Sequence, residues 1–153
     1  MKALTIRQPW AWSIAAGHKP IENRGWVTPH RGQLAVHSAK QFDDHPEDAL
    51  RMVRDILRAS GTPYPKTFHD ALPLAGGGLV LATVDLVDVC TASYDTETVA
   101  CGCGPWAMPG QAHWRLADAR PLGEPVPATG RLGLWDWAPA PTPSGGTAPK
   151  ETT

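Results

Sequence analysis

The densest group of chemically active side chains lies in the stretch GHKPIENRGW, residues 17 to 26. Lys19, Glu22 and Arg24 place an ammonium, a carboxylate and a guanidinium close together in the chain. A desolvated lysine beside a carboxylate can act as a base or orient a water molecule, and the same groups can bind a polar ligand. An exposed pair of this kind would stabilise the fold by only about 0–1 kcal/mol. The residue types alone therefore leave a polar pocket and a solvated turn as alternatives.

The spacing of these residues does not by itself bring all three together. Residues 19 to 24 are predicted to be extended, so successive side chains alternate between two faces. Alternation places Glu22 and Arg24 on one face and Lys19 on the other. Lys19 can reach Glu22 only if a turn or bulge interrupts the segment, and Pro20 favours such an interruption.

The surroundings of this stretch fit a nucleobase pocket, which needs an aromatic face, polar groups for the base edge and cations for phosphate. The chain has seven Trp against two Phe and two Tyr. Trp10 and Trp26 can each stack on a base, which contributes roughly 1–3 kcal/mol per base. Glu22 can accept a hydrogen bond from an exocyclic amine, as carboxylates do with cytosine. The candidate cations are Arg7, Lys19, Arg24 and Arg31.

Charge is distributed unevenly along the chain. The net charge of −1 argues against a generic polyanion binder, which would usually be strongly basic. Residues 1–40, however, hold six Lys or Arg against one Glu, a net charge of +5. A cationic N-terminal third within a near-neutral protein favours a local anion site over a long duplex footprint.

The three cysteines are Cys90, Cys101 and Cys103. An odd number of cysteines in a chain without an export signal does not indicate a disulfide framework. Cys101 and Cys103 form C-x-C rather than the C-x2-C of common zinc sites, and the nearest histidine is His113. We therefore expect thiols in a partly buried loop, with no metal site and no cofactor.

The elements that must position these residues are mostly strands. Alternating or β-branched patterns predict them at 3–7, 33–38, 79–89, 112–122 and 133–137, with an extended PIEN segment at 20–23. A short helix is predicted in QPWAWSIAAG and a long amphipathic helix over 45–59. Few helices and five or six strands exclude a βαβ series. They predict an α+β, mainly β fold, a curled mixed β-barrel with flanking helices.

The chain is expected to form one domain over residues 1–137. Residues 138–153 have almost no apolar bulk and are predicted to be a disordered Pro/Thr/Gly-rich tail. No apolar run is long enough to span a bilayer and the N-terminal sequence has no signal-peptide pattern. We expect a cytoplasmic protein without a membrane partner.

Several segments together resemble the ASCH domain of the PUA-like superfamily. They are LTIRQPWAWSIAAGHKPIENRGW, RGQLAVHSAK, GLVLATVDLVDV, HWRL and GLW. The G-x-K-x-x-E-x-R signature of that family is filled by Gly17, Lys19, Glu22 and Arg24, and the resemblance covers about residues 1–137. It implies a PUA-like β-barrel with a cleft beside the first helix. Its expected partner is RNA, or a nucleoside or nucleotide with a modified base.

The resemblance also implies a second wall for the cleft and an enzymatic alternative. In relatives, the loop before the H-W strand faces the cleft, which would bring in Trp106 and His113. Some small ASCH proteins are amidohydrolases that deacetylate N4-acetylcytidine, and others are reported as ribonucleases. The deacetylating members have Thr three residues after the lysine, where this chain has Glu22. We therefore expect a binding domain, with an amidohydrolase or ribonuclease using Lys19 and Glu22 as the alternative. An interaction module for another protein is a further class, since fold does not fix function.

Overall fold

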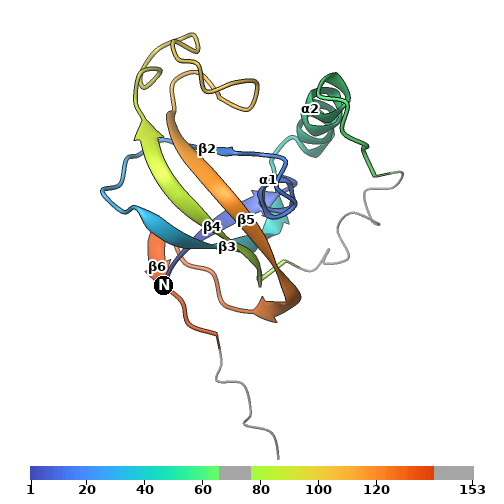
Figure 1. Ribbon diagram of the computed structural model, residues 1–153, viewed down its shortest axis with the longest axis vertical. Helices are drawn as coiled ribbons and strands as arrows, with labels where there is room; N and C mark the ends of the chain where they lie inside the picture. Colours follow the sequence, from blue (N-terminus) through green and yellow to red (C-terminus); the bar gives the residue numbers. More distant parts are fainter. Residues whose placement is uncertain (66–76, 140–153) are drawn as a thin grey trace, which may run out of the picture.

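A computed structural model describes residues 1–65 and 77–139 of the chain (Figure 1). Six strands and two helices follow one another along it. Their bounds are β1 Lys2–Gln8, α1 Trp10–Ala15, β2 Ile21–Arg24, β3 Gly32–Phe42, α2 Pro46–Ala59, β4 Leu79–Cys90, β5 Ala112–Pro127 and β6 Leu134–Asp136. The predicted mainly β architecture is confirmed. Most of the predicted tail lies outside the described residues.

All six strands form one mixed sheet, in the order β2-β5-β4-β3-β1-β6. β1 and β3 run parallel, and the other neighbouring strands pair antiparallel. The sheet curls, and Figure 1 shows β2 running crosswise to β4 and β5 near the start of β5, with which it pairs. Within the described ranges its edge strands β2 and β6 do not pair with each other, so closure into the predicted barrel is not observed.

A side chain spans part of this opening. Arg24, at the end of β2, donates a hydrogen bond from Nη2 to the backbone carbonyl of Thr5 in β1, over 3.0 Å. The guanidinium thus supplies a polar link between two strands that share no ladder hydrogen bonds. It also holds the residues of the charged stretch close to β1.

The main core lies between the sheet and α1, which packs against β1, β3, β4 and β5. α1 ends at Ala15, and Gly17 follows the capping residue with a φ of 79°, the left-handed conformation that glycine adopts at little cost. Ile14 of α1 and Trp114 of β5 are both fully buried. The other fully buried members are Leu4, Ala11, Leu34, Val36, Ala82, Val84, Leu86 and Ala112.

α2 packs elsewhere, beside the sheet rather than on it (Figure 1). Pro46 at its first turn, followed by two acidic residues, gives the predicted N-terminus. Val53 and Leu57 of α2 form a buried cluster with Ile21 and with Trp106, which lies in the connection between β4 and β5. Ala49 of α2 is also buried. Neither described helix has the length and hydropathy needed to cross a membrane.

Candidate functional site

Glu22 is the centre of a buried ionic group. Its Oε2 lies 2.8 Å from Lys19 Nζ, and its Oε1 lies 3.0 Å from Arg24 Nη2. Lys19 is 4% exposed and Glu22 is 6% exposed, which excludes the solvated turn. Because β2 starts only at Ile21, Lys19 precedes the strand and strand alternation does not apply to it. The Lys19 ammonium also donates to the Ile21 carbonyl.

Burial lowers the pKa of Lys19 below its ordinary value. The carboxylate of Glu22 opposes this shift, whereas the nearby Arg24 reinforces it. Removing one partner of a buried ion pair generally costs about 3–5 kcal/mol, because the other charge is left without compensation. Each buried charge in this group is therefore compensated by its partner rather than by solvent.

Glu22 and Arg24 line a cleft with a volume of about 1270 Å³. The cleft lies among β1, β2, the end of β3 and the connection from β5 to β6. Two other predicted residues, Arg7 and Trp10, also line it. Lys19 is not among its lining residues, so Lys19 holds the Glu22 carboxylate from behind the cleft wall.

The indole of Trp10 is fixed at this wall. Its Nε1 donates to Asp43 Oδ2 over 2.9 Å, and the Lys19 ammonium lies 5.7 Å from the ring centroid. Burial acts to raise the pKa of Asp43. Hydrogen bonds from Trp10 and from the backbone N–H of His45 outweigh that effect and lower it. Trp10 is thus an aromatic surface in the cleft with a set orientation.

Two cations of the cleft were not predicted from the sequence. Lys40, near the end of β3, and Arg131, between β5 and β6, both line it. Across residues 1–65 and 77–139, neither makes a hydrogen bond or ion pair, whereas Arg7 is paired with Asp44 at 2.7 Å. Nothing in the local spacing marks Lys40 or Arg131, because only the folded sheet brings their segments together.

Gly130 allows the β5–β6 connection to pack closely on the cleft. A Cβ at this position would lie 2.5 Å from His37 Cε1 and 2.8 Å from Thr5 Oγ1. His37 in turn donates a hydrogen bond from its Nε2 to the Ala128 carbonyl, over 3.0 Å. Burial lowers the pKa of His37, so this cleft residue favours its neutral form.

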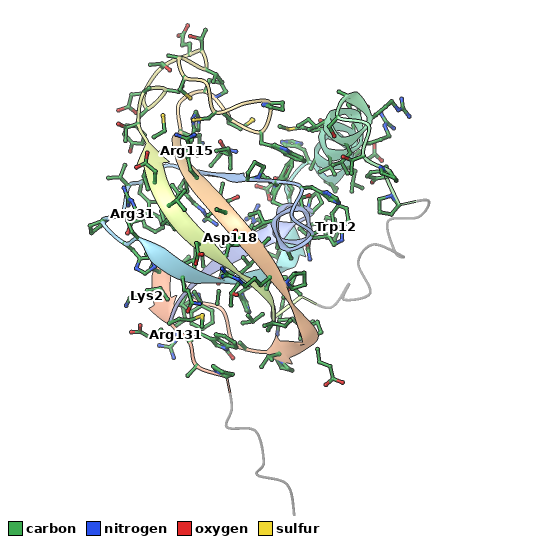
Figure 2. The ribbon with its side chains drawn as sticks, viewed as in Figure 1. Lys2, Trp12, Arg31, Arg115, Asp118 and Arg131 are labelled. Carbon is green, nitrogen blue, oxygen red and sulfur yellow. The ribbon has the colours of Figure 1, made fainter. Side chains whose placement is uncertain are left out.

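The structure places Trp26 and Arg31 outside the cleft lining. Trp26 packs edge to face against Trp114, with ring centroids 4.7 Å apart. Arg31 donates to the carbonyls of Thr28 and His30 in its own loop. Figure 2 shows Arg31 at a different place on the molecule from the cleft residue Arg131.

Trp106 and His113 also lie away from the cleft. Trp106 is buried against α2, and His113 is fully buried beneath the β4–β5 connection. Of the nine predicted site residues, the structure brings Arg7, Trp10, Glu22 and Arg24 together in the cleft with Lys19 behind them. It does not bring the other four into the cleft.

Comparison with known proteins identifies the family to which the chain belongs. The model of the ASCH domain family matches residues 4–126. Activating signal cointegrator 1 of Homo sapiens is 33% identical over 86 residues, which cover 56% of this chain and 14% of that protein. The Mus musculus protein of the same name is 31% identical over the same length. The match thus spans about a seventh of these relatives. The chain belongs to the ASCH domain family.

Proposed function

We propose that the cleft binds a single-stranded segment of RNA, recognising one nucleobase at Glu22 and neighbouring phosphates through the surrounding cations. The observation that carries this proposal is the Glu22 carboxylate, fixed in the cleft wall between two cations. Each of its oxygens has lone pairs beyond those used by Lys19 and Arg24. An exocyclic amine of a base can donate to them.

The size and charge of the cleft support a strand rather than a free nucleoside. Its volume of about 1270 Å³ exceeds the roughly 300–1,000 Å³ typical of small-molecule pockets. Arg7, Lys40 and Arg131 line it and are suited to phosphate. Trp10 supplies an aromatic surface beside Glu22 on which a base can stack.

One observation favours an amidohydrolase as a second candidate. A buried lysine with a lowered pKa pairs with a carboxylate that lines the cleft. In that case Glu22 would activate a water for attack on an N-acetyl group, and Lys19 would position Glu22. Binding is preferred because the Lys19 ammonium is committed to Glu22 and the Ile21 carbonyl behind the wall.

Salt dependence of RNA affinity tests the cleft assignment. Fluorescence anisotropy with a short mixed single-stranded RNA is measured over a series of salt concentrations. Lys40→Ala and Arg131→Ala should each flatten the slope of log affinity against log salt by about 0.7 for each phosphate that the variant no longer neutralises. Arg31→Ala removes a cation outside the cleft and should leave the slope unchanged. Equal effects of all three substitutions would mean that RNA binds elsewhere on the protein.

Glu22→Gln tests base recognition with little change of shape. Anisotropy with homopolymeric RNAs should show a base preference in the wild type that shrinks by about 1–3 kcal/mol in the variant. The same two proteins are incubated with N4-acetylcytidine and RNA, followed by chromatography. Cytidine released only by the wild type would establish the hydrolase instead, and RNA cleavage abolished in the variant would establish a ribonuclease.

A further inference from the structure

Four side chains with metal-ligating atoms meet at the base of the connection between β4 and β5. They are Cys90, Cys101, Cys103 and His113, and their sulfur and nitrogen atoms all lie within 4.8 Å of one another. Cys90 ends β4 and is directly paired with His113 near the start of β5. The other two cysteines come from the connection itself. None of the four lines the cleft.

The ring of His113 is oriented for ligation. Its Nε2 lies 2.6 Å from the Met108 carbonyl oxygen, which can only accept a hydrogen bond. Nε2 therefore carries a proton, and the tautomer with a single proton on Nε2 has its lone pair on Nδ1. Nδ1 faces the thiols and lies 3.1 Å from Cys101 Sγ. Metal-binding histidines commonly donate their other N–H to a backbone carbonyl in this way.

We propose that Cys90, Cys101, Cys103 and His113 bind one Zn²⁺ ion in a tetrahedral structural site. Zinc–sulfur distances of about 2.3 Å and a zinc–nitrogen distance of about 2.0 Å give a tetrahedron with edges of roughly 3.5–3.8 Å. The observed spread of ligand atoms, up to 4.8 Å, needs only a small contraction. Three thiolates and one imidazole are a soft, closed set that suits zinc and leaves no position for substrate.

The zinc would tie a long connection to the sheet. Residues 91–111 separate β4 from β5, well beyond the roughly 12–15 residues above which unstructured loops become uncommon. Two ligands lie at the paired strand ends and two lie within the connection, so one ion would tether the connection to the sheet. The same segment carries Trp106 to its buried contact with α2. The predicted role is to stabilise this part of the fold.

Asn23 of β2 shows that this connection is docked in a defined position. Its Nδ2 donates to the Trp106 carbonyl over 2.9 Å, and its Oδ1 accepts from the Met108 N–H over 2.8 Å. Asn23 and His113 are directly paired across β2 and β5. Met108 is thus held by both residues, which fixes the carbonyl that orients the His113 ring.

The sequence predicted no metal site here because Cys101 and Cys103 are separated by a single residue. The structure brings this pair to Cys90 and His113, which lie on either side of the connection. The signal was the position of a cysteine at the end of one predicted strand and a histidine at the start of the next. It becomes meaningful only once those strands are known to pair.

Metal content of the untagged full chain is the direct test. The protein is incubated with Zn²⁺, passed through a desalting column and measured by plasma mass spectrometry. Roughly one zinc per chain is expected. The zinc content of Cys101→Ser and of His113→Ala should be lower than that of the wild type by about tenfold or more. The control is His45→Ala, which removes an exposed histidine outside the cluster and should bind as much zinc as the wild type.

A second measurement covers variants that fail to fold. Wild-type protein is loaded with Co²⁺, and tetrahedral thiolate ligation should give intense visible bands with a thiolate-to-cobalt charge-transfer band. A chelator should lower the Tm of the wild type, and Zn²⁺ but not Mg²⁺ should restore it. Three results would each overturn the proposal. One is that all three thiols of zinc-treated native protein react freely with a thiol reagent. The others are a disulfide between Cys101 and Cys103 and a cobalt spectrum without thiolate bands.

Discussion

The cleft and the thiol–imidazole cluster depend on the same pair of strands. Across β2 and β5, Glu22 is paired with Trp114 and the next residue, Asn23, is paired with His113. Glu22 and Asn23 both line the cleft, and the Asn23 amide also holds the connection that carries two of the cluster cysteines. Strand β2 is therefore common to the two sites. The cleft is open and ionic, whereas the cluster is compact and rich in sulfur, so the two sites suit a ligand and a structural metal respectively.

Glu22→Ala should have the largest effect on stability. It leaves Lys19 buried without its carboxylate, so the free energy of unfolding should fall by about 3–5 kcal/mol in urea titrations. Asp48→Ala removes the carboxylate of an exposed pair on α2 and should cost about 0–1 kcal/mol. Adding Lys19→Met to Glu22→Ala should recover much of the loss. Equal costs for the two single variants would show that the cleft pair is no stronger than a surface pair.

Asn23→Ala should have an intermediate effect on stability, because it loosens the docking of the connection between β4 and β5. It leaves the Trp106 carbonyl and the Met108 N–H without their partner, which should cost about 1–3 kcal/mol. Limited proteolysis should cut residues 91–111 faster in the variant, as followed by mass spectrometry. An unchanged cleavage rate would mean that Asn23 does not dock this connection.

The two sites should also be separable in function. Treating wild-type protein with a chelator should lower its Tm while changing RNA affinity by less than about twofold, because no cluster residue lines the cleft. Glu22→Gln should alter base preference and leave zinc content unchanged. Anisotropy and metal analysis on the same preparations check both statements. Loss of RNA binding with loss of zinc would show that the two regions form one site.

Lowering the pH should have the smallest effect on the free energy of unfolding, and it acts through protonation of His37 in the cleft. Burial lowers its pKa in the folded state, from an ordinary value of 6.5. Above that pH the ring is neutral in both states, and as pH falls the unfolded state takes up the proton first, so stability is lost. The decline between pH 7 and pH 5 in urea midpoints should be smaller in His37→Gln. His45→Gln, at an exposed position, should decline like the wild type.

Most elements were predictable because their patterns are local. The helix expected over 45–59 is found at Pro46–Ala59, where proline and acidic residues mark its start. β5 was the clearest exception. The strand predicted over 112–122 extends to Pro127, through a stretch with glycine and proline that was expected to be a connection. It continues because it pairs with β4 as far as Leu79 opposite Pro127, with register shifts on the way. Long-range pairing overrides the local turn signal there.

The cleft was predictable only where one segment supplies it. Lys19, Glu22 and Arg24 lie within a few residues, so their chemistry was visible although strand alternation argued against contact between Lys19 and Glu22. Lys40 and Arg131 enter from distant segments and gave no signal. Trp26 was expected to offer a stacking face in the pocket, yet it packs against Trp114 because this arrangement covers apolar surface.

The position of β1 in the sheet has a consequence for chain synthesis. β1 pairs on one side with β3 and on the other with β6, and the Trp135 indole donates to Thr5 across 130 residues of sequence. A growing chain therefore carries β1 with one unpaired edge until nearly all later elements have been made. Exposed strand edges promote pairing between molecules. Nascent or truncated chains that lack β6 are thus the species most in need of protection from aggregation.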